Sequence, residues 1–274
     1  MGLWARFSFS ILQVIFLRML TVKTKEEIQI LREGGKRLAF ILKSVGEAVK
    51  PGISTDKLNS LAGELALQNG DKPSLLGYKP RGSKRPYPAS ICISLNDEVV
   101  HGIPNENPKI IQEGDIVKLD MCLTHKGLIT DATITVPAGR VDKESQKLIS
   151  ASRDALYAGI KAAKGGKYTG DIGFAIERVA KANRFSVVEE LCGHGVGYKV
   201  HEDPYVPNYG DKGTGDKLKP GMVLALEPML NEGSKDVYLA EDGYTYKTRD
   251  GKKSAHFEHT IVITAKGSEI LTEL

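Results

Sequence analysis

Apolar residues recur at helical spacing in four stretches of the chain. The first stretch opens on a capping box over residues 24–27 and ends at Pro51. Its apolar face consists of Ile28, Leu31, Leu38, Ile41, Leu42, Val45 and Val49. A second helix is expected to start at Thr55 as its cap, and two more are predicted over about 143–163 and 170–183.

Strand patterns separate the two pairs of helices and dominate from residue 187 onward. Residues 91–100 are predicted to form one strand, and residues 114–136 to form a hairpin that turns near 125–127. Asp120 and Asp131 are symmetric about the point between residues 125 and 126, which predicts that they lie directly opposite each other. Two carboxylates so placed repel unless a cation is shared between them.

The alternative for this hairpin is an exposed face with solvated acids. We favour burial, because the flanking residues are apolar: Ile116, Val117, Leu119, Ile129 and Ile134, together with Thr133.

The chain carries one arrangement of motifs twice. Each copy has H-x-x-P, then a glycine followed six residues later by an acid, then an acid that opens D/E-x-T-I. The copies run through His101, Pro104, Gly114, Asp120 and Asp131, and through His201, Pro204, Gly221, Glu227 and Glu258. Upstream, residues 50–58 are echoed by residues 164–172. This repeat predicts two related halves, about 25–140 and 141–265, whose junction collects four acids.

Those four acids lie in apolar strand contexts, where burial is costly without a cation. A glycine-flanked histidine, His194, adds an imidazole to the set. The candidate ligands are Asp120, Asp131, His194, Glu227 and Glu258. Four carboxylates and one imidazole suit two divalent ions such as manganese, iron or cobalt better than a thiolate zinc site. Paired ions generate a nucleophile at neutral pH, so the chemistry expected is hydrolysis.

The composition indicates the class of protein and the cellular compartment. The chain has 274 residues, an ordinary globular composition and a net charge of +4, which does not by itself indicate nucleic-acid binding. Its three cysteines show no C-x-x-C spacing, which favours a reduced, intracellular protein. Residues 1–18 are basic and partly apolar, and they indicate either a targeting or membrane-surface segment or an upstream start, with Met19 opening the core over 19–274.

These motifs resemble those of type I methionine aminopeptidases in their bacterial short form. The resemblance covers about residues 20–274, and its motifs lie at residues 90–104, 114–120, 192–197, 218–229 and 258–262. It implies an α+β, pita-bread (creatinase/aminopeptidase) fold with two pseudo-symmetric halves around a dinuclear metal cleft. It also implies a cytoplasmic monomer that removes the initiator methionine from nascent chains when the second residue is small.

Carried over by position, the resemblance implies that Asp131 and Glu258 bridge two ions. Asp120 would complete one site, and His194 and Glu227 the other, with Glu227 also managing the proton of the attacking water. His201 would bind the scissile carbonyl, and His101 would act near the leaving amine. The ions would be cobalt, manganese, iron or zinc, and a monovalent cation is expected near Asn96 and Ser254.

The same resemblance places Tyr78, Tyr87, Cys92, Val200 and Tyr244 around the methionine side chain. The family usually has an aromatic residue where this chain has Val200 and a tryptophan near Tyr244, so the pocket is expected to be reshaped. Residues 79–85 form a basic loop, which is either a contact for ribosomal RNA or, as we favour, a solvated surface.

Related families and functions remain as alternatives. Prolidases and aminopeptidase P carry the same metal set but usually have a large extra N-terminal domain, for which residues before 25 leave no room. Type II enzymes carry a helical insert, and the segment between His201 and Glu227 is too short for one. A catalytically inactive homologue that binds the ribosome or RNA is the different-class alternative. No stable nucleic-acid binding is expected, and a transient ribosome contact is left open.

Overall fold

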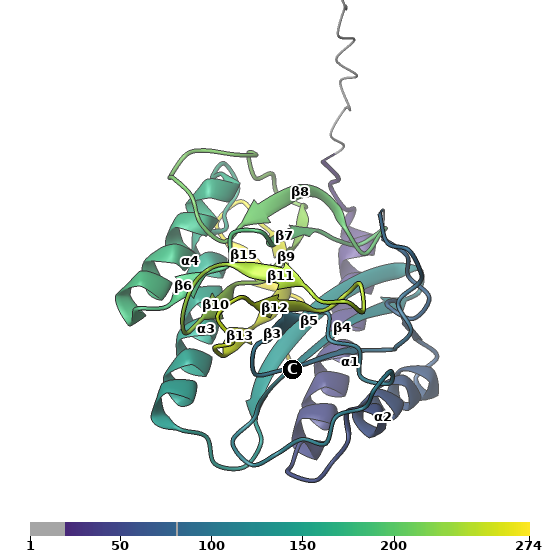
Figure 1. The fold of residues 1–274 in the computed structure, drawn as a ribbon. Coiled ribbons are helices and arrows are strands. Elements are labelled where there is room, and N and C mark those ends of the chain that lie inside the picture. Colours follow the sequence, from purple (N-terminus) through teal and green to yellow (C-terminus); the bar gives the residue numbers. More distant parts are fainter. Residues whose placement is uncertain (1–19, 81) are drawn as a thin grey trace, which may run out of the picture.

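The structure is a computed structural model that describes residues 20–80 and 82–274. The predicted extension over 1–18, the start expected at Met19, and Arg81 of the basic loop lie outside the described residues. The largest element of the described part is a nine-stranded sheet in the order β1-β4-β5-β14-β9-β7-β8, with β2 beside β4 and β15 beside β14 (Figure 1). The strands are β1 Lys72–Pro73, β2 Cys92–Leu95, β4 Ile116–His125, β5 Leu128–Pro137, β7 Cys192–Gly195, β8 Glu202–Pro207, β9 Val223–Leu226, β14 Glu258–Ile263 and β15 Ser268–Ile270.

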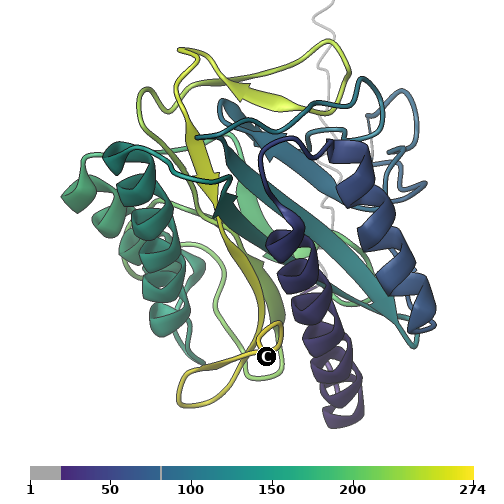
Figure 2. The same ribbon diagram turned by 90° about the horizontal axis from the view of Figure 1, so that it is seen from below.

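One pair of helices covers each half of this sheet (Figure 2). Helices α1 (Lys25–Ala48) and α2 (Thr55–Gln68) share an apolar core with β2, β4 and β5. Helices α3 (Lys143–Ala162) and α4 (Thr169–Asn183) share a second core with β9 and β14. The four predicted helices are therefore confirmed, although α1 ends at Ala48 rather than at the expected Pro51, and each half has its own hydrophobic core.

The starts of α1 and α2 differ from each other. At α1 the predicted capping box is confirmed, since Thr24 Oγ1 accepts from the Glu27 amide at 3.2 Å and Glu27 Oε2 accepts from the Thr24 amide at 2.8 Å. At α2 the prediction is wrong, because Ser54 is the cap residue and makes no side-chain capping bond. The Thr55 hydroxyl instead donates to Pro104 O at 2.7 Å, which ties the helix to the proline of the first H-x-x-P motif.

The hairpin of β4 and β5 is present, but its register corrects the prediction. Its turn consists of Lys126 and Gly127, both with positive φ (47° and 84°), which is typical of a two-residue hairpin turn. Asp120 therefore pairs with Thr133, not with Asp131. The two acids still share one face, as diagonal rather than opposite neighbours, because side chains alternate between faces with a period of two.

The repeat seen in the sequence is matched by repeated contacts. Two backbone hydrogen bonds of the first half have an equivalent in the second half. Gly52 N donates to Ile111 O as Gly166 N donates to Leu218 O, and Gly114 N donates to Ala138 O as Gly221 N donates to Ile263 O. All four glycines have φ between 86° and 90°, a region that side chains disfavour. The halves meet where β5 pairs with β14, which is the arrangement expected of the pita-bread fold.

Two small sheets complete the described part, in the orders β13-β10-β6 and β11-β12-β3. Their strands are β3 Glu98–Val100, β6 Ser186–Val187, β10 Met229–Asn231, β11 Val237–Leu239, β12 Tyr246–Thr248 and β13 Ser254–His256. The single strand predicted over 91–100 is wrong, because a turn at Asn96 (φ 47°) divides it into β2 and β3. The three cysteines are free. None of the described helices has the length and apolar character needed to cross a bilayer.

Candidate metal centre and substrate pocket

Residues paired across three neighbouring strands form the first row of side chains in the site. Asp120 on β4 pairs with Thr133 on β5, and Thr133 pairs with Glu258 on β14. Paired residues of adjacent strands project from the same face of a sheet. The two acids thus flank one threonine at the junction of the two halves of the chain.

A second row, two residues along the strands, brings in further ligands. Cys122 pairs with Asp131 across β4 and β5, and His194 on β7 pairs with Ala225 on β9. Glu227 follows Ala225 by two residues, so alternation places it on the same face. Four of the predicted ligands therefore lie on strands of this sheet, Glu227 directly follows β9, and all five share one face of the sheet.

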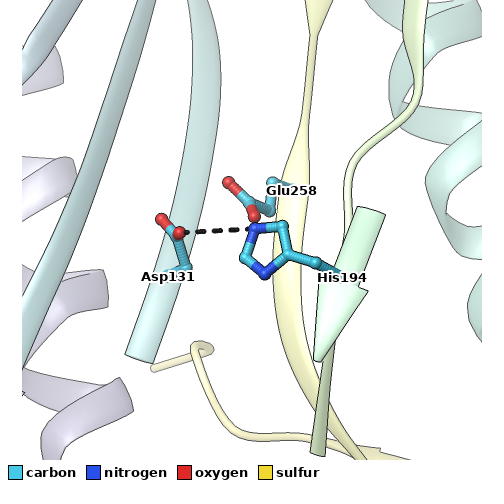
Figure 3. A group of neighbouring side chains, drawn as sticks. All are labelled: Asp131, His194 and Glu258. Carbon is cyan, nitrogen blue, oxygen red and sulfur yellow. Dashed lines mark ion pairs between the residues drawn. The ribbon is translucent and has the colours of Figure 1, made fainter. Parts of the chain in front are cut away.

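Three of these side chains form the tightest group (Figure 3). One ligand atom from each of Asp131, His194 and Glu258 lies within 4.8 Å of the others, and all three side chains are buried. His194 Nε2 is 3.9 Å from Asp131 Oδ2 and 3.4 Å from Glu227 Oε1. Asp120 and Glu227 line the same cavity as this group.

The hydrogen bonds of the two central carboxylates fit a bound cation. Cys122 Sγ donates to Asp131 Oδ2 at 2.9 Å, and the Thr133 hydroxyl donates to Glu258 Oε2 at 2.9 Å. The second oxygen of each, Asp131 Oδ1 and Glu258 Oε1, is buried and has no hydrogen-bond partner among the described residues. A buried oxygen without a donor is costly, and a cation supplies the missing partner.

His194 is oriented as a metal ligand. Its Nδ1 lies 2.9 Å from Gly195 O, so Nδ1 carries the proton and donates to this carbonyl. Burial and the neighbouring His201 lower the pKa of His194 to about 3. The lone pair on Nε2 therefore faces the acids, an arrangement that repels without a cation and binds one readily.

The acids themselves resist ionisation when no cation pairs with them. Burial raises the pKa of Asp120 to about 8, and the Asp131 carboxylate adds to the rise. Burial raises the pKa of Asp131 to about 6. It also raises the pKa values of Glu227 and Glu258 well above their usual range, and Asp131 adds to both. Such a cluster is characteristic of a functional site.

One pocket collects the predicted site residues. Its lining includes all five predicted ligands, both predicted histidines and the predicted apolar residues Tyr78, Tyr87, Cys92, Val200 and Tyr244. Sequence reasoning missed Leu75, Pro80 and Cys122, which also line it. Cys122 follows Asp120 by two residues on β4, so the strand period was the signal for it.

The two H-x-x-P histidines reach the pocket from opposite halves. His201 Nδ1 lies 2.9 Å from the Tyr78 hydroxyl, and its ring centroid is 4.5 Å from that of His194. His101 has φ 60°, an unusual conformation for a residue other than glycine. Burial and the nearby His201 lower the pKa of His101 to about 4, so its imidazole is neutral at pH 7.

An apolar wall faces the acids. Tyr87 and Tyr244 pack edge to face with ring centroids 5.1 Å apart, and Val200 and Cys92 join them in one cluster. The Tyr244 hydroxyl donates to Arg85 O, so the basic loop supports this wall. Arg85 is itself paired with Glu106 at 2.5 and 2.6 Å.

His256 is a further residue that sequence reasoning missed. It is buried, and neither ring nitrogen has a hydrogen-bond partner in the described part of the chain. Its Nε2 lies 3.8 Å from Glu227 Oε2. His256 precedes Glu258 by two residues, and this spacing was the signal that the two face the same way.

Comparison with known proteins agrees with this geometry. Residues 29–265 match Metallopeptidase family M24. The chain is 46% identical over 254 residues to a methionine aminopeptidase of Aquifex aeolicus, covering 92% of this chain and 98% of that one. It is 41% identical over 256 residues to methionine aminopeptidase 1 of Bacillus subtilis, covering 93% of this chain and all of the relative.

Solved structures show the same relationship. The methionine aminopeptidase of Thermotoga maritima superposes with a TM-score of 0.89 and 40% identity, over 93% of this chain and all of that one. The prolidase of Pyrococcus furiosus shares the fold alone, with a TM-score of 0.71 and 22% identity, over 93% of this chain and 66% of that one. By these matches and by its fold, the chain belongs to metallopeptidase family M24 and, within it, to the methionine aminopeptidases.

Proposed function

We propose that this chain is a dinuclear metallo-exopeptidase that removes the initiator methionine from nascent proteins whose second residue is small. One observation carries the proposal: five candidate metal ligands, two histidines and an apolar wall line the same pocket. The unpartnered oxygens of Asp131 and Glu258 support cation binding at its floor. The relatives named methionine aminopeptidase support the choice of substrate.

The proposed ligand roles follow from position. Asp131 and Glu258 lie in the tightest group with His194, and their carboxylates would hold both ions. Asp120 is assigned to one ion, and His194 with Glu227 to the other. When bound, the two divalent cations would supply Lewis acidity and a lowered water pKa, which makes a nucleophile available at neutral pH.

The protein groups then handle protons and the developing charge. Glu227 is placed to accept a proton from the attacking water, because its carboxylate lies at the pocket beside His194. The Tyr78 hydroxyl is placed to donate to His201 Nδ1, which leaves Nε2–H to donate to the oxyanion that forms at the scissile carbonyl. His101, neutral and on the same pocket, is assigned to the leaving amine.

The methionine side chain is proposed to pack on the wall of Tyr78, Tyr87, Cys92, Val200 and Tyr244. A flexible thioether suits such a surface of aromatic rings and sulfur. Val200 is buried there and smaller than the aromatic residue usual in the family, so we expect this chain to tolerate a wider first residue than its relatives do.

We also propose a cellular compartment, an oligomeric state and domain boundaries for this protein. The substrate is made by ribosomes, so we place the protein in the cytoplasm as a monomer that contacts nascent chains transiently. We retain residues 19–274 as one peptidase domain with halves of about 25–140 and 141–265.

The test is hydrolysis of Met-Gly-Met-Met by protein stripped of metal and then supplied with manganese, iron or cobalt. We expect release of methionine that depends on the added metal, and slower release from peptides that begin with leucine or proline. Preferential release of leucine would contradict the methionine pocket but keep the peptidase. No release with any metal, despite metal binding, would favour a non-catalytic homologue.

A further inference from the structure

A lysine lies deep in the molecule beside the metal centre. Lys118 on β4 is 1% exposed, although lysine is rarely buried without a paired charge. Its Nζ donates to two backbone carbonyls, Asn96 O and Ser254 O, each at 2.8 Å. Lys118 precedes the candidate ligand Asp120 by two residues, so both project from the same face of β4.

The two carbonyls come from segments far apart in the chain. Asn96 lies in the turn between β2 and β3, and its side chain fixes that turn by donating to Asp115 Oδ1 at 2.8 Å and accepting from the Ile116 amide at 3.1 Å. Ser254 opens β13, and its amide donates to Asn96 O at 3.0 Å. The carbonyl cradle is therefore held rigidly, and Asn96 O already accepts two hydrogen bonds.

This cradle coincides with the place where the family resemblance implies a monovalent cation. Backbone carbonyls that converge on one point replace the hydration shell of an alkali ion. Here the amine of Lys118 already lies within hydrogen-bonding distance of both carbonyl oxygens. The residues present therefore do not fit an additional ion between Asn96 and Ser254.

We propose that the Lys118 side chain permanently occupies the position of the expected monovalent cation, so that this chain neither needs nor binds sodium or potassium there. The amine bridges β4, the β2–β3 turn and β13, the strand that leads to the candidate ligand Glu258. The Lys118 amine, which is part of the chain, thus links the carbonyls of Asn96 and Ser254 in place of an exchangeable ion. The inference does not rest on the peptidase activity.

Occupancy of the cradle does not depend on the charge of Lys118. The two hydrogen bonds use two protons, and both the ammonium and the neutral amine carry at least that many. Burial lowers the pKa of Lys118 to about 7, and the nearby carboxylates of Glu98 and Asp97 partly offset this fall. Glu98 is itself paired with Lys109 and accepts from the Leu95 amide at 2.9 Å.

The experiment compares thermal unfolding of the full-length chain in potassium, sodium and choline chloride at one ionic strength. The wild-type Tm should be the same in all three salts. Lys118→Ala should lower the Tm in choline by about 5 °C or more, because two buried carbonyls lose a donor. Potassium or sodium should recover a large part of that loss, since the cradle is then open to an ion.

The matched control is Lys23→Ala, which removes another buried lysine. Lys23 Nζ is paired with a carboxylate, Glu202 Oε2, at 2.7 Å and not with backbone carbonyls. Its variant should lose stability equally in all three salts. Should Lys118→Ala not accumulate as folded protein, Lys118→Asn is used, because its shorter side chain also leaves room for an ion.

Two results would overturn the proposal. One is a wild-type Tm that potassium or sodium raises relative to choline, because the chain would then bind the ion that Lys118 is said to replace. The other is a Lys118 variant that responds to the three salts no differently from Lys23→Ala. Both readouts are independent of methionine release, so a failed peptidase assay would leave this result interpretable.

Discussion

Buried ionisable groups on one face of the nine-stranded sheet satisfy their hydrogen-bonding needs in two opposite ways. Lys118 finds its partners within the chain, because both Asn96 O and Ser254 O accept from its Nζ. The acids beside it do not, because Asp131 Oδ1 and Glu258 Oε1 have no donor among the described residues. Lys118 is thus a structural residue whose hydrogen bonds are complete, whereas the acids need a bound cation. The unpartnered oxygens of the acids therefore mark the functional site.

The largest effect is expected when an acid of the cluster loses its proton-accepting role. Glu227→Gln keeps the size of the side chain but removes the base, so kcat for methionine release should fall by about 10²–10⁴-fold. Steady-state kinetics on Met-Gly-Met-Met with saturating manganese measures this. An undiminished kcat would show that Glu227 does not take the proton.

A smaller effect is expected when a carboxylate loses the donor that orients it. Thr133→Val removes the hydroxyl that donates to Glu258 Oε2 at 2.9 Å and nearly preserves side-chain shape. Supporting groups of this kind change metal affinity by about 10–100-fold, so manganese should bind roughly tenfold more weakly. Titration calorimetry of the metal-free protein gives the value, and unchanged affinity would argue against Glu258 as a ligand held by Thr133.

His256 tests whether the acid cluster needs a further donor. Because Nε2 lies 3.8 Å from Glu227 Oε2, we expect His256→Ala to weaken manganese binding by roughly tenfold, as for other residues that position ligands. His256→Gln keeps a donor and should restore most of the affinity. Equal loss in both variants would indicate a packing role, which the same titration distinguishes.

The smallest effect is expected at an exposed lysine. Lys84 lies on the basic loop, where solvent satisfies its charge. Lys84→Ala should change the free energy of unfolding by no more than about 0.5 kcal/mol, in contrast to Lys118→Ala. Denaturant unfolding measures both variants, and a similar loss in the two would remove the distinction between structural and surface lysines.

Much of the fold was predictable, because helices and repeats leave strong local signals. The capping box at Thr24, the four helices and the repeated glycine turns follow from spacing alone. The hairpin register was not predictable to one residue, because it depends on which two residues take positive φ in the turn. Because the turn lies one residue further along the chain than predicted, the cross-strand partner of Asp120 is Thr133 and not Asp131.

The candidate site was predictable as a set but not as an arrangement. The acids stood out because carboxylates in apolar strands are unusual, whereas Cys122 and His256 look like ordinary strand residues in sequence. Lys118 also gave no signal, since its partners are backbone carbonyls contributed by Asn96 and Ser254 from distant segments. Every residue has a backbone carbonyl, so the order of side chains along the chain does not indicate which carbonyls converge on Lys118.

The most direct test of the comparison is native mass spectrometry of the wild-type chain after dialysis against manganese and potassium together. We expect a mass that corresponds to two manganese ions and no potassium. Both acids and lysine are then satisfied, one by recruited ions and the other by the chain. A species without manganese, or one that retains potassium in addition to manganese, would contradict this expectation.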